Sequence, residues 1–206
     1  MSGHWAIPRE WEGQTAVVLG GGPSLKKAQL DYAISKGCRR VAVNDAGLVF
    51  DPNADVLCWG DPQWFVWNSD ELRLHRGQYK ITWRMMPTRP ALPFHTLGHP
   101  RMPPYVSFNQ SEVCANNSGM GGINIAALFG AKRILLLGFD MRCVDGVNHW
   151  HNRHKVATSE HRYPELYKPP MDAAAQEYAA AGIEVINCTE FSGLKGYRYA
   201  SIGSMV

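Results

Sequence analysis

A glycine-rich turn directly follows an apolar run, where residues 17–25 read Val-Val-Leu-Gly-Gly-Gly-Pro-Ser-Leu. Glycine allows positive φ angles and a close approach of the backbone to a ligand. The N–H groups at the start of a following helix attract an anion, and a serine there can cap the helix or donate to a phosphate. The turn has neither the Gly-Lys-Ser/Thr ending of a P-loop nor the GxGxxG pattern of dinucleotide-binding proteins, so a turn that serves only packing is the alternative. The residues that we expect to bind phosphate are Gly20, Gly21, Gly22, Pro23 and Ser24.

Polar side chains follow the later apolar runs, at the positions where strands would end. Asn44 follows the second run, Asp61 the third and Asp140 the fourth. Ligands of open parallel sheets bind beyond the carboxyl ends of the strands, so these side chains are candidates to contact a ribose, a base or a hydroxyl. Turn residues and helix caps are the alternative. A further polar segment opens a later helical pattern and could hold an anion at the helix start: Asn117, Ser118 and Gly119.

Histidines cluster in residues 149–154, which read His-Trp-His-Asn-Arg-His. Histidine is the usual acid or base near neutral pH, so His149, His151 and His154 are the candidate catalytic bases. A phosphate contact, a zinc site and a solvated loop are the alternatives. The HExxH spacing of zinc enzymes is absent and no cysteine joins the cluster, so we expect no metal ligands here.

The elements that would position these residues alternate between strands and helices. Short apolar runs predict strands buried on both faces at Thr15–Leu19, Arg40–Val43, Val56–Trp59, Arg133–Leu137 and Glu184–Asn187. Helical patterns cover Ser24–Lys36, Gly121–Phe129 and Met171–Ala181. This alternation predicts an α/β, Rossmann-like fold with a mostly parallel sheet flanked by helices. We expect one nucleotide-binding domain over residues 1–206.

Two irregular segments interrupt the alternation. Residues 80–105, here called the flap, hold six of the 13 prolines and several arginines, with a short strand expected at Lys80–Arg84. Residues 143–170, here called the lid, hold the histidine cluster. Long loops in compact domains are usually functional or disordered, so we expect the flap and the lid to border the site.

Composition narrows the class of protein. The 21 basic and 18 acidic residues give a net charge of +3, which is low for a protein that binds nucleic acid. The five cysteines form no CxxC pair and predict neither a zinc ribbon nor a disulfide framework. Residues 1–13 hold no apolar signal core, and no apolar run reaches the roughly 20 residues that span a bilayer. We therefore expect a cytoplasmic protein without a membrane span.

The order of the motifs resembles a known superfamily. An apolar strand followed by G-x-G-P-S-L, an Asn at the end of the second strand, S-G before an Ala-rich helix and a strand that ends G-F-D occur in that order. This set is similar to that of the bacterial CMP-sialic-acid sialyltransferases and the related 6-hydroxymethylpterin pyrophosphokinase-like proteins of Rossmann-like fold. The resemblance covers residues 16–140 in spaced islands and is weaker over residues 171–188.

The resemblance implies roles for residues that match its motifs. Gly20, Gly22, Pro23 and Ser24 would line the nucleotide phosphate, and Asn44 would contact the sugar or base of the nucleotide. Ser118 and Gly119 would hold the anionic part of the donor, while Gly138 and Asp140 would complete the edge formed by the strand ends. Asp61 stands where the sialyltransferases have an Asn.

This chain also departs from the sialyltransferase pattern. Gly21 replaces an Asn that contacts the reacting region, and Arg142 replaces a phosphate-binding Tyr. The general-base His of the sialyltransferases precedes their last helix, where this chain reads Tyr-Lys-Pro-Pro at residues 167–170. A histidine of the lid would therefore have to act as the base.

Three functions remain open. The first is a glycosyltransferase-like enzyme that moves a sugar from a nucleotide-activated donor to a hydroxyl acceptor without a metal, with Arg142 or Arg153 beside the leaving phosphate. The second is a Mg²⁺-dependent pyrophosphokinase acting on a small alcohol such as a pterin, with Asp45, Asp61 and Asp140 as ligands. The third is a non-catalytic nucleotide-binding module. The basic, aromatic flap leaves a nucleic-acid acceptor and a homo-oligomer open.

Overall fold

The computed structural model describes residues 5–86, 92–153, 155 and 159–205. Its centre is a seven-stranded sheet in the order β5-β4-β3-β2-β1-β6-β7, and every neighbouring pair of strands is parallel. The strands are β1 (Thr15–Leu19), β2 (Arg39–Val43), β3 (Val56–Trp59), β4 (Tyr79–Thr82), β5 (His95–Thr96), β6 (Arg133–Leu137) and β7 (Glu184–Asn187). The predicted α/β, Rossmann-like fold is confirmed. The chain order reverses between β1 and β6, and ligands of such sheets bind at this reversal.

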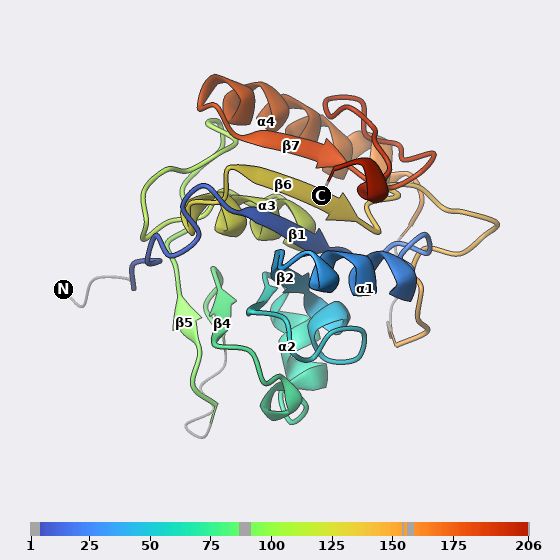
Figure 1. Ribbon diagram of the computed structural model, residues 1–206. Coiled ribbons are helices and arrows are strands. Elements are labelled where there is room, and N and C mark those ends of the chain that lie inside the picture. The colour runs from blue at the N-terminus through green and yellow to red at the C-terminus, as the bar shows by residue number, and fades with distance from the viewer. Residues whose placement is uncertain (1–4, 87–91, 154, 156–158, 206) are drawn as a thin grey trace.

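Helices cover both faces of the sheet because alternate strand residues are apolar on each side. On one face, Val17 and Leu19 of β1 join a buried cluster with Leu30 of α1 (Lys27–Ser35). On the other face, Ala16 and Val18 join a cluster that includes the buried sides of α3 (Ser118–Leu128) and α4 (Lys168–Ala180). In Figure 1, α1 lies in front of the sheet and α3 behind it.

All three predicted helices begin at other residues than the sequence predicts, and α4 begins at Lys168 rather than Met171. α1 begins at Lys27 rather than Ser24, because the Ser24 Oγ and N–H both donate to Asp140, at 2.7 and 3.3 Å. α3 begins at Ser118 rather than Gly121, because the Asn117 side chain caps it by accepting the Met120 N–H at 3.0 Å. The shifted helix starts do not change the order of the helices and strands along the chain.

The sequence analysis missed α2 (Pro62–Asn68) and the two-residue strand β5. Asp61 caps α2 by accepting the Gln63 N–H at 2.8 Å, and Pro62 occupies the first helical position, where proline is favoured. Trp64 and Phe65 of α2 pack on Trp59 at the end of β3. α2 therefore covers the end of β3 close to the flap.

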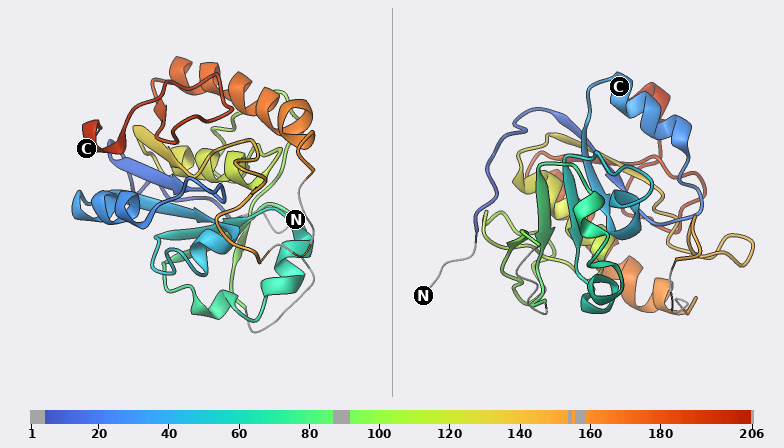
Figure 2. Two further views of the ribbon diagram at one scale, coloured as in Figure 1. Left: turned by 90° about the vertical axis from the view of Figure 1, so that its right-hand side faces the viewer. Right: turned by 90° about the horizontal axis from the view of Figure 1, so that it is seen from below.

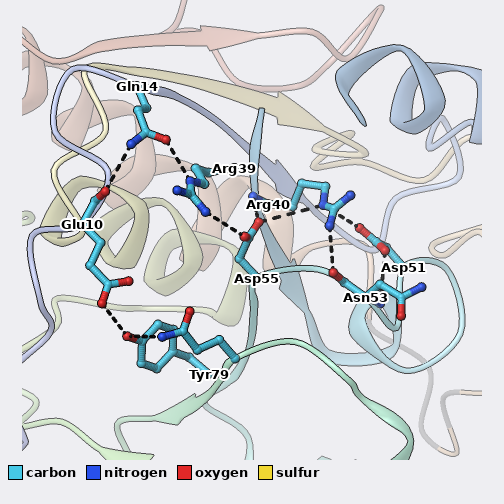
Figure 3. Close-up of polar contacts among 9 residues, drawn as sticks. Glu10, Gln14, Arg39, Arg40, Asp51, Asn53, Asp55 and Tyr79 are labelled. Carbon is cyan, nitrogen blue, oxygen red and sulfur yellow. Dashed lines mark hydrogen bonds and ion pairs between the residues drawn. The ribbon is translucent and has the colours of Figure 1, made fainter. Parts of the chain in front are cut away.

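A polar network fastens the amino ends of β2 and β3 (Figure 3). The Asp55 carboxylate accepts the Arg40 N–H at 2.8 Å and an Arg39 Nη1–H at 3.3 Å. The Arg40 Nε lies 3.3 Å from Oδ2 of the buried Asp51, and burial raises the pKa of Asp51. Figure 3 also shows Tyr79, whose hydroxyl donates to Glu10 at 2.9 Å. Ion pairs and hydrogen bonds between these side chains therefore hold this edge of the sheet together.

Candidate functional site

A cavity of about 730 Å³ lies at the carboxyl edge of the sheet, which is within the usual size of a small-molecule site. The arrowheads of β1 and β6 point to this side, where the lid lies (Figure 1), and the lid crosses in front of the sheet when viewed from there (Figure 2, left). The predicted site residues that line the cavity are Gly20, Gly21, Gly22, Asn44, Asp61, Asn117, Ser118, Gly119, Asp140, His149 and His151. The fold thus brings together residues that are far apart in sequence.

Four predicted residues are not among those that line this cavity. Pro23 and Ser24 do not line it, and the Ser24 hydroxyl donates to Asp140. Arg142 is exposed and lines a second, smaller cavity, so its contact with the nucleotide phosphate stays a prediction. His154 lies outside the described residues.

Two N–H groups of the glycine turn already donate to the segment at the end of β6. The Gly20 N–H donates to the Leu137 carbonyl at 2.8 Å, and the Gly22 N–H donates to the Gly138 carbonyl at 2.9 Å. A Cβ at Gly22 would lie 1.9 Å from Asp140 Oδ2, so glycine is required for this close approach. An anion bound by this turn would also face the Asp140 carboxylate. The three glycines form a wall of the cavity, and phosphate binding at residues 20–24 stays a prediction.

The start of α3 is the better anion site. The N–H groups of Ser118 and Gly119 belong to the first turn of this 11-residue helix and precede its first intrahelical hydrogen bond. The Ser118 Oγ accepts the Gly60 N–H at 3.3 Å, which holds the helix start against the end of β3. Backbone N–H groups and the helix dipole together favour a negative group here.

Three amide atoms in the cavity wall lack partners. Asn44 Oδ1, Asn116 Oδ1 and Asn117 Nδ2 are buried and have no hydrogen bond to any described residue. A buried polar atom without a partner costs about 1–3 kcal/mol, so a ligand that supplies the missing hydrogen bonds would be bound favourably. Asn44 also has a φ of +53°, a conformation that is uncommon outside glycine and that concentrates at functional sites.

The lid is tied to the sheet through Asp45, which is 2% exposed. Asp45 Oδ1 accepts the Arg153 Nε–H at 2.6 Å, and Oδ2 accepts the Trp64 Nε1–H at 2.7 Å. The Arg153 Nη2 also donates to Glu71 at 2.6 Å. Because its guanidinium is held between two carboxylates, Arg153 anchors the lid and does not face a leaving phosphate.

The hydrogen-bond partners of His149 and His151 indicate which ring nitrogen of each carries a proton. The Nδ1 of His149 lies 3.3 Å from the Gly21 carbonyl, which can only accept, so Nδ1 carries the proton and Nε2 the lone pair. The Nδ1 of His151 accepts the Arg153 N–H at 3.2 Å, so its proton is on Nε2, which lies 3.9 Å from Asp45 Oδ2. Of these two histidines, His149 is the one whose Nδ1 faces a carbonyl, which makes its Nε2 the candidate base nitrogen, whereas His151 is bonded to Arg153 of the lid.

Asp140 lies three residues after the end of β6, beside the glycine turn, and is 3% exposed. Burial raises its pKa, and the two hydrogen bonds from Ser24 act in the opposite direction. A carboxylate at this place can accept hydrogen bonds from sugar hydroxyls.

Several cavity residues were not predicted as site residues: Arg84, Arg162, Tyr163 and Tyr167. Tyr163 and Tyr167 lie at the two ends of a π-helical turn (Tyr163–Tyr167) that runs directly into α4, and no sequence signal marks such a turn. Burial is the main cause that raises the pKa of Tyr163 to about 12, so its hydroxyl is a neutral donor near pH 7. Arg84 and Arg162 are exposed and add positive charge to the wall.

The carboxylates considered as Mg²⁺ ligands already have other partners. Asp45 binds Arg153 and Trp64, Asp61 caps α2, and Asp140 accepts from Ser24. In the described part of the chain, no three His, Cys, Asp or Glu side chains gather in a way that could hold a metal ion. The expected three-carboxylate ligand set is therefore not assembled. Among the same residues, no helix has the length and apolar character needed to cross a membrane.

Comparisons with known proteins identify the fold. No protein-family model and no curated protein sequence matches the chain. Among solved structures, the chain is similar to the sialyltransferase CstII from Campylobacter jejuni, which was solved in complex with a substrate analogue, cytidine-5'-monophosphate. The TM-score is 0.57 at 11% sequence identity, over 92% of this chain and 86% of that chain. At this identity the likeness establishes a shared sialyltransferase-like fold.

Proposed function

We propose that the protein is a glycosyltransferase that moves a sugar from a nucleotide-activated donor to a hydroxyl acceptor. The observation that carries the proposal is the set of unpartnered amide atoms of Asn44, Asn116 and Asn117 around one cavity. They lie beside the start of α3, at the edge of a fold shared with a sialyltransferase. A nucleotide supplies both the polar groups that the amides lack and the negative charge that the helix start favours.

The donor would lie across the reversal of strand order between β1 and β6. Its nucleoside would pass the glycine turn and Asn44, and its phosphate would reach the N–H groups of Ser118 and Gly119. Negative charge develops on the phosphate as the sugar leaves, and preorganised donors stabilise that charge. The Tyr163 hydroxyl and the Arg162 guanidinium line the same cavity and are the further donors.

The reaction requires one bond to form and one to break. The acceptor oxygen bonds to the anomeric carbon while the bond from that carbon to the phosphate oxygen breaks, and the nucleotide departs with the electron pair. The acceptor proton passes to Nε2 of His149, which is positioned by its hydrogen bond to the Gly21 carbonyl. Asp140 would accept hydrogen bonds from hydroxyls of the transferred sugar or the acceptor.

A matched pair of histidine variants tests the role of His149. His99 also directs Nδ1 at a backbone carbonyl, that of Val113 at 3.1 Å, but is not among the residues lining the cavity. The donors in this assay are sugars linked to the nucleotide that the protein binds. His149→Gln should lower kcat by about 10²–10⁴-fold and leave the nucleotide affinity unchanged. His99→Gln should leave kcat unchanged. Full activity of His149→Gln would exclude His149 as the base.

A further inference from the structure

A second cavity of about 230 Å³ adjoins the nucleotide cavity. Met141 and Tyr163 line both cavities, so the two are separated by a shared wall. The sugar-transfer step proposed above makes no use of this second cavity. Its volume is smaller than that of typical sites for whole small molecules, and it suits a single charged group.

The second cavity is lined by basic side chains without ion-pair partners. Arg142, His161 and Lys168 contribute the basic groups, and Glu160 is the carboxylate among the described lining residues. Within the part of the chain that the structure describes, neither Arg142, His161 nor Lys168 forms an ion pair. Unpaired cations around one concave surface focus a positive potential and attract an anion.

One π-helical turn contributes residues to the walls of both cavities. In the π-helical turn Tyr163–Tyr167, both tyrosines line the nucleotide cavity, while Pro164 and the following Lys168 line the second cavity. Single π-helical turns occur frequently at functional sites. Tyr163 is 8% exposed and belongs to both walls, so a molecule held in the second cavity would lie next to the donor.

We propose that the second cavity binds a carboxylate or phosphate group of the acceptor and so directs the acceptor hydroxyl past Tyr163 toward the donor. Arg142 is the principal ligand because guanidinium pairs with both oxyanions through two parallel hydrogen bonds. Lys168 adds a second charge-assisted donor. The assignment to the acceptor rests on the proposed sugar transfer, whereas anion binding at this cavity does not.

The first test measures anion binding itself. Inorganic phosphate and acetate would be titrated calorimetrically at constant ionic strength into the wild type and three variants, with CMP present in excess. Arg142→Gln and Lys168→Met should each raise the dissociation constant of the preferred anion about tenfold. Arg73→Gln removes the same charge from an exposed position that lines neither cavity, and should have no effect. Equal affinities in all four proteins, or no anion binding by the wild type, would overturn the proposal.

The second test asks whether the anionic group bound in the second cavity belongs to the acceptor. With an acceptor that carries a carboxylate or phosphate, Arg142→Gln should raise the acceptor KM about tenfold and leave kcat and the donor KM unchanged. A neutral acceptor of the same skeleton should show no change. An equal effect on both acceptors would exclude the acceptor assignment. Anion binding that depends on Arg142 in a protein without transferase activity would refute the proposed function and leave the anion site standing.

Discussion

The Nε of Arg153 lies 2.6 Å from Oδ1 of Asp45, so the lid is bonded to the residue that directly follows Asn44 in the cavity wall. The same guanidinium reaches Glu71 and the Asn68 side chain. One side chain of the lid therefore connects the end of β2 with the residues that follow α2. A nucleotide that contacts Asn44, as proposed, would lie next to this connection.

Arg153→Gln should destabilise the protein and loosen the lid. Without the Arg153 guanidinium, the carboxylate of Asp45, which is 2% exposed, keeps the Trp64 Nε1–H as its main hydrogen-bond donor. We expect the free energy of unfolding to fall by about 2 kcal/mol, less than for a fully buried pair because the Arg153 side chain is 32% exposed. A double-mutant cycle with Asp45→Asn, followed by urea denaturation, should give a coupling of at least about 1 kcal/mol. Additive effects would show that the pair does not hold the lid.

Gly22→Ala should disrupt the junction between the glycine turn and β6. The new Cβ would lie 1.9 Å from Asp140 Oδ2 and 2.7 Å from the Gly138 carbonyl, and the backbone partner cannot rotate away. We expect a loss of about 1–3 kcal/mol in unfolding free energy, measured by thermal denaturation. Gly203→Ala is the control, because the nearest atom to its Cβ would be 3.8 Å away. Equal melting temperatures for the two variants would contradict the close packing at Gly22.

The scaffold was predictable from the sequence because strands buried on both faces leave short, unbroken apolar runs. Four of the six predicted strands match the structure to the residue, and β2 begins one residue earlier than expected. The strand expected at Lys80–Arg84 is β4, which covers Tyr79–Thr82. The Asp-Pro pair that starts α2 was visible, but Asp61 was interpreted as a ligand contact at a strand end, with a turn as the alternative. β5 has two residues, which is too short for any periodicity.

The site was predictable in its location and less so in its chemistry. Strand-end residues such as Asn44 and Asp140 meet at one cavity because parallel strands end at one edge. Sequence could not reveal that the Gly22 N–H and the Ser24 hydroxyl bond to the end of β6, since that depends on tertiary packing. It also could not place Tyr163, because a π-helical turn sets its direction.

Substitutions at Asn44 distinguish the effect of its side-chain amide on nucleotide affinity from the effect of its backbone conformation on stability. Asn44→Gly permits the φ of +53° and removes the amide, so affinity for the bound nucleotide should fall about tenfold with no loss of stability. Asn44→Ala should show the same loss of affinity and a further cost of about 1–2 kcal/mol in unfolding free energy from the left-handed conformation. Titration calorimetry and urea denaturation measure the two quantities. Unchanged affinity in Asn44→Gly would exclude contact between Asn44 and the nucleotide.

His75 should make stability depend on pH. It is 2% exposed, its Nδ1 lies 3.0 Å from the Gly47 carbonyl, and burial lowers its pKa from 6.5 to about 4. Because the folded state binds fewer protons than the unfolded state in this window, stability is full above pH 6.5 and falls as the pH drops toward 4. The full loss would be about 3 kcal/mol. His75→Gln keeps a donor and does not titrate, so its unfolding free energy should fall less between pH 6.5 and 4.5. An equal fall in unfolding free energy for the variant and the wild type would contradict the role of His75 in this pH dependence.

A thermal-shift panel of nucleotides, run with and without Mg²⁺, tests the central claim most directly. The panel would contain CMP, CDP, UDP, GDP, ADP, ATP and CMP-sialic acid. A ligand at one hundred times its dissociation constant stabilises the native state by about 2.7 kcal/mol, which raises the melting temperature measurably. The account predicts a metal-independent shift with CMP or a nucleoside diphosphate, which is lowered in Asn44→Gly. A shift seen with ATP and Mg²⁺ alone, or no shift with any of these nucleotides, would contradict it.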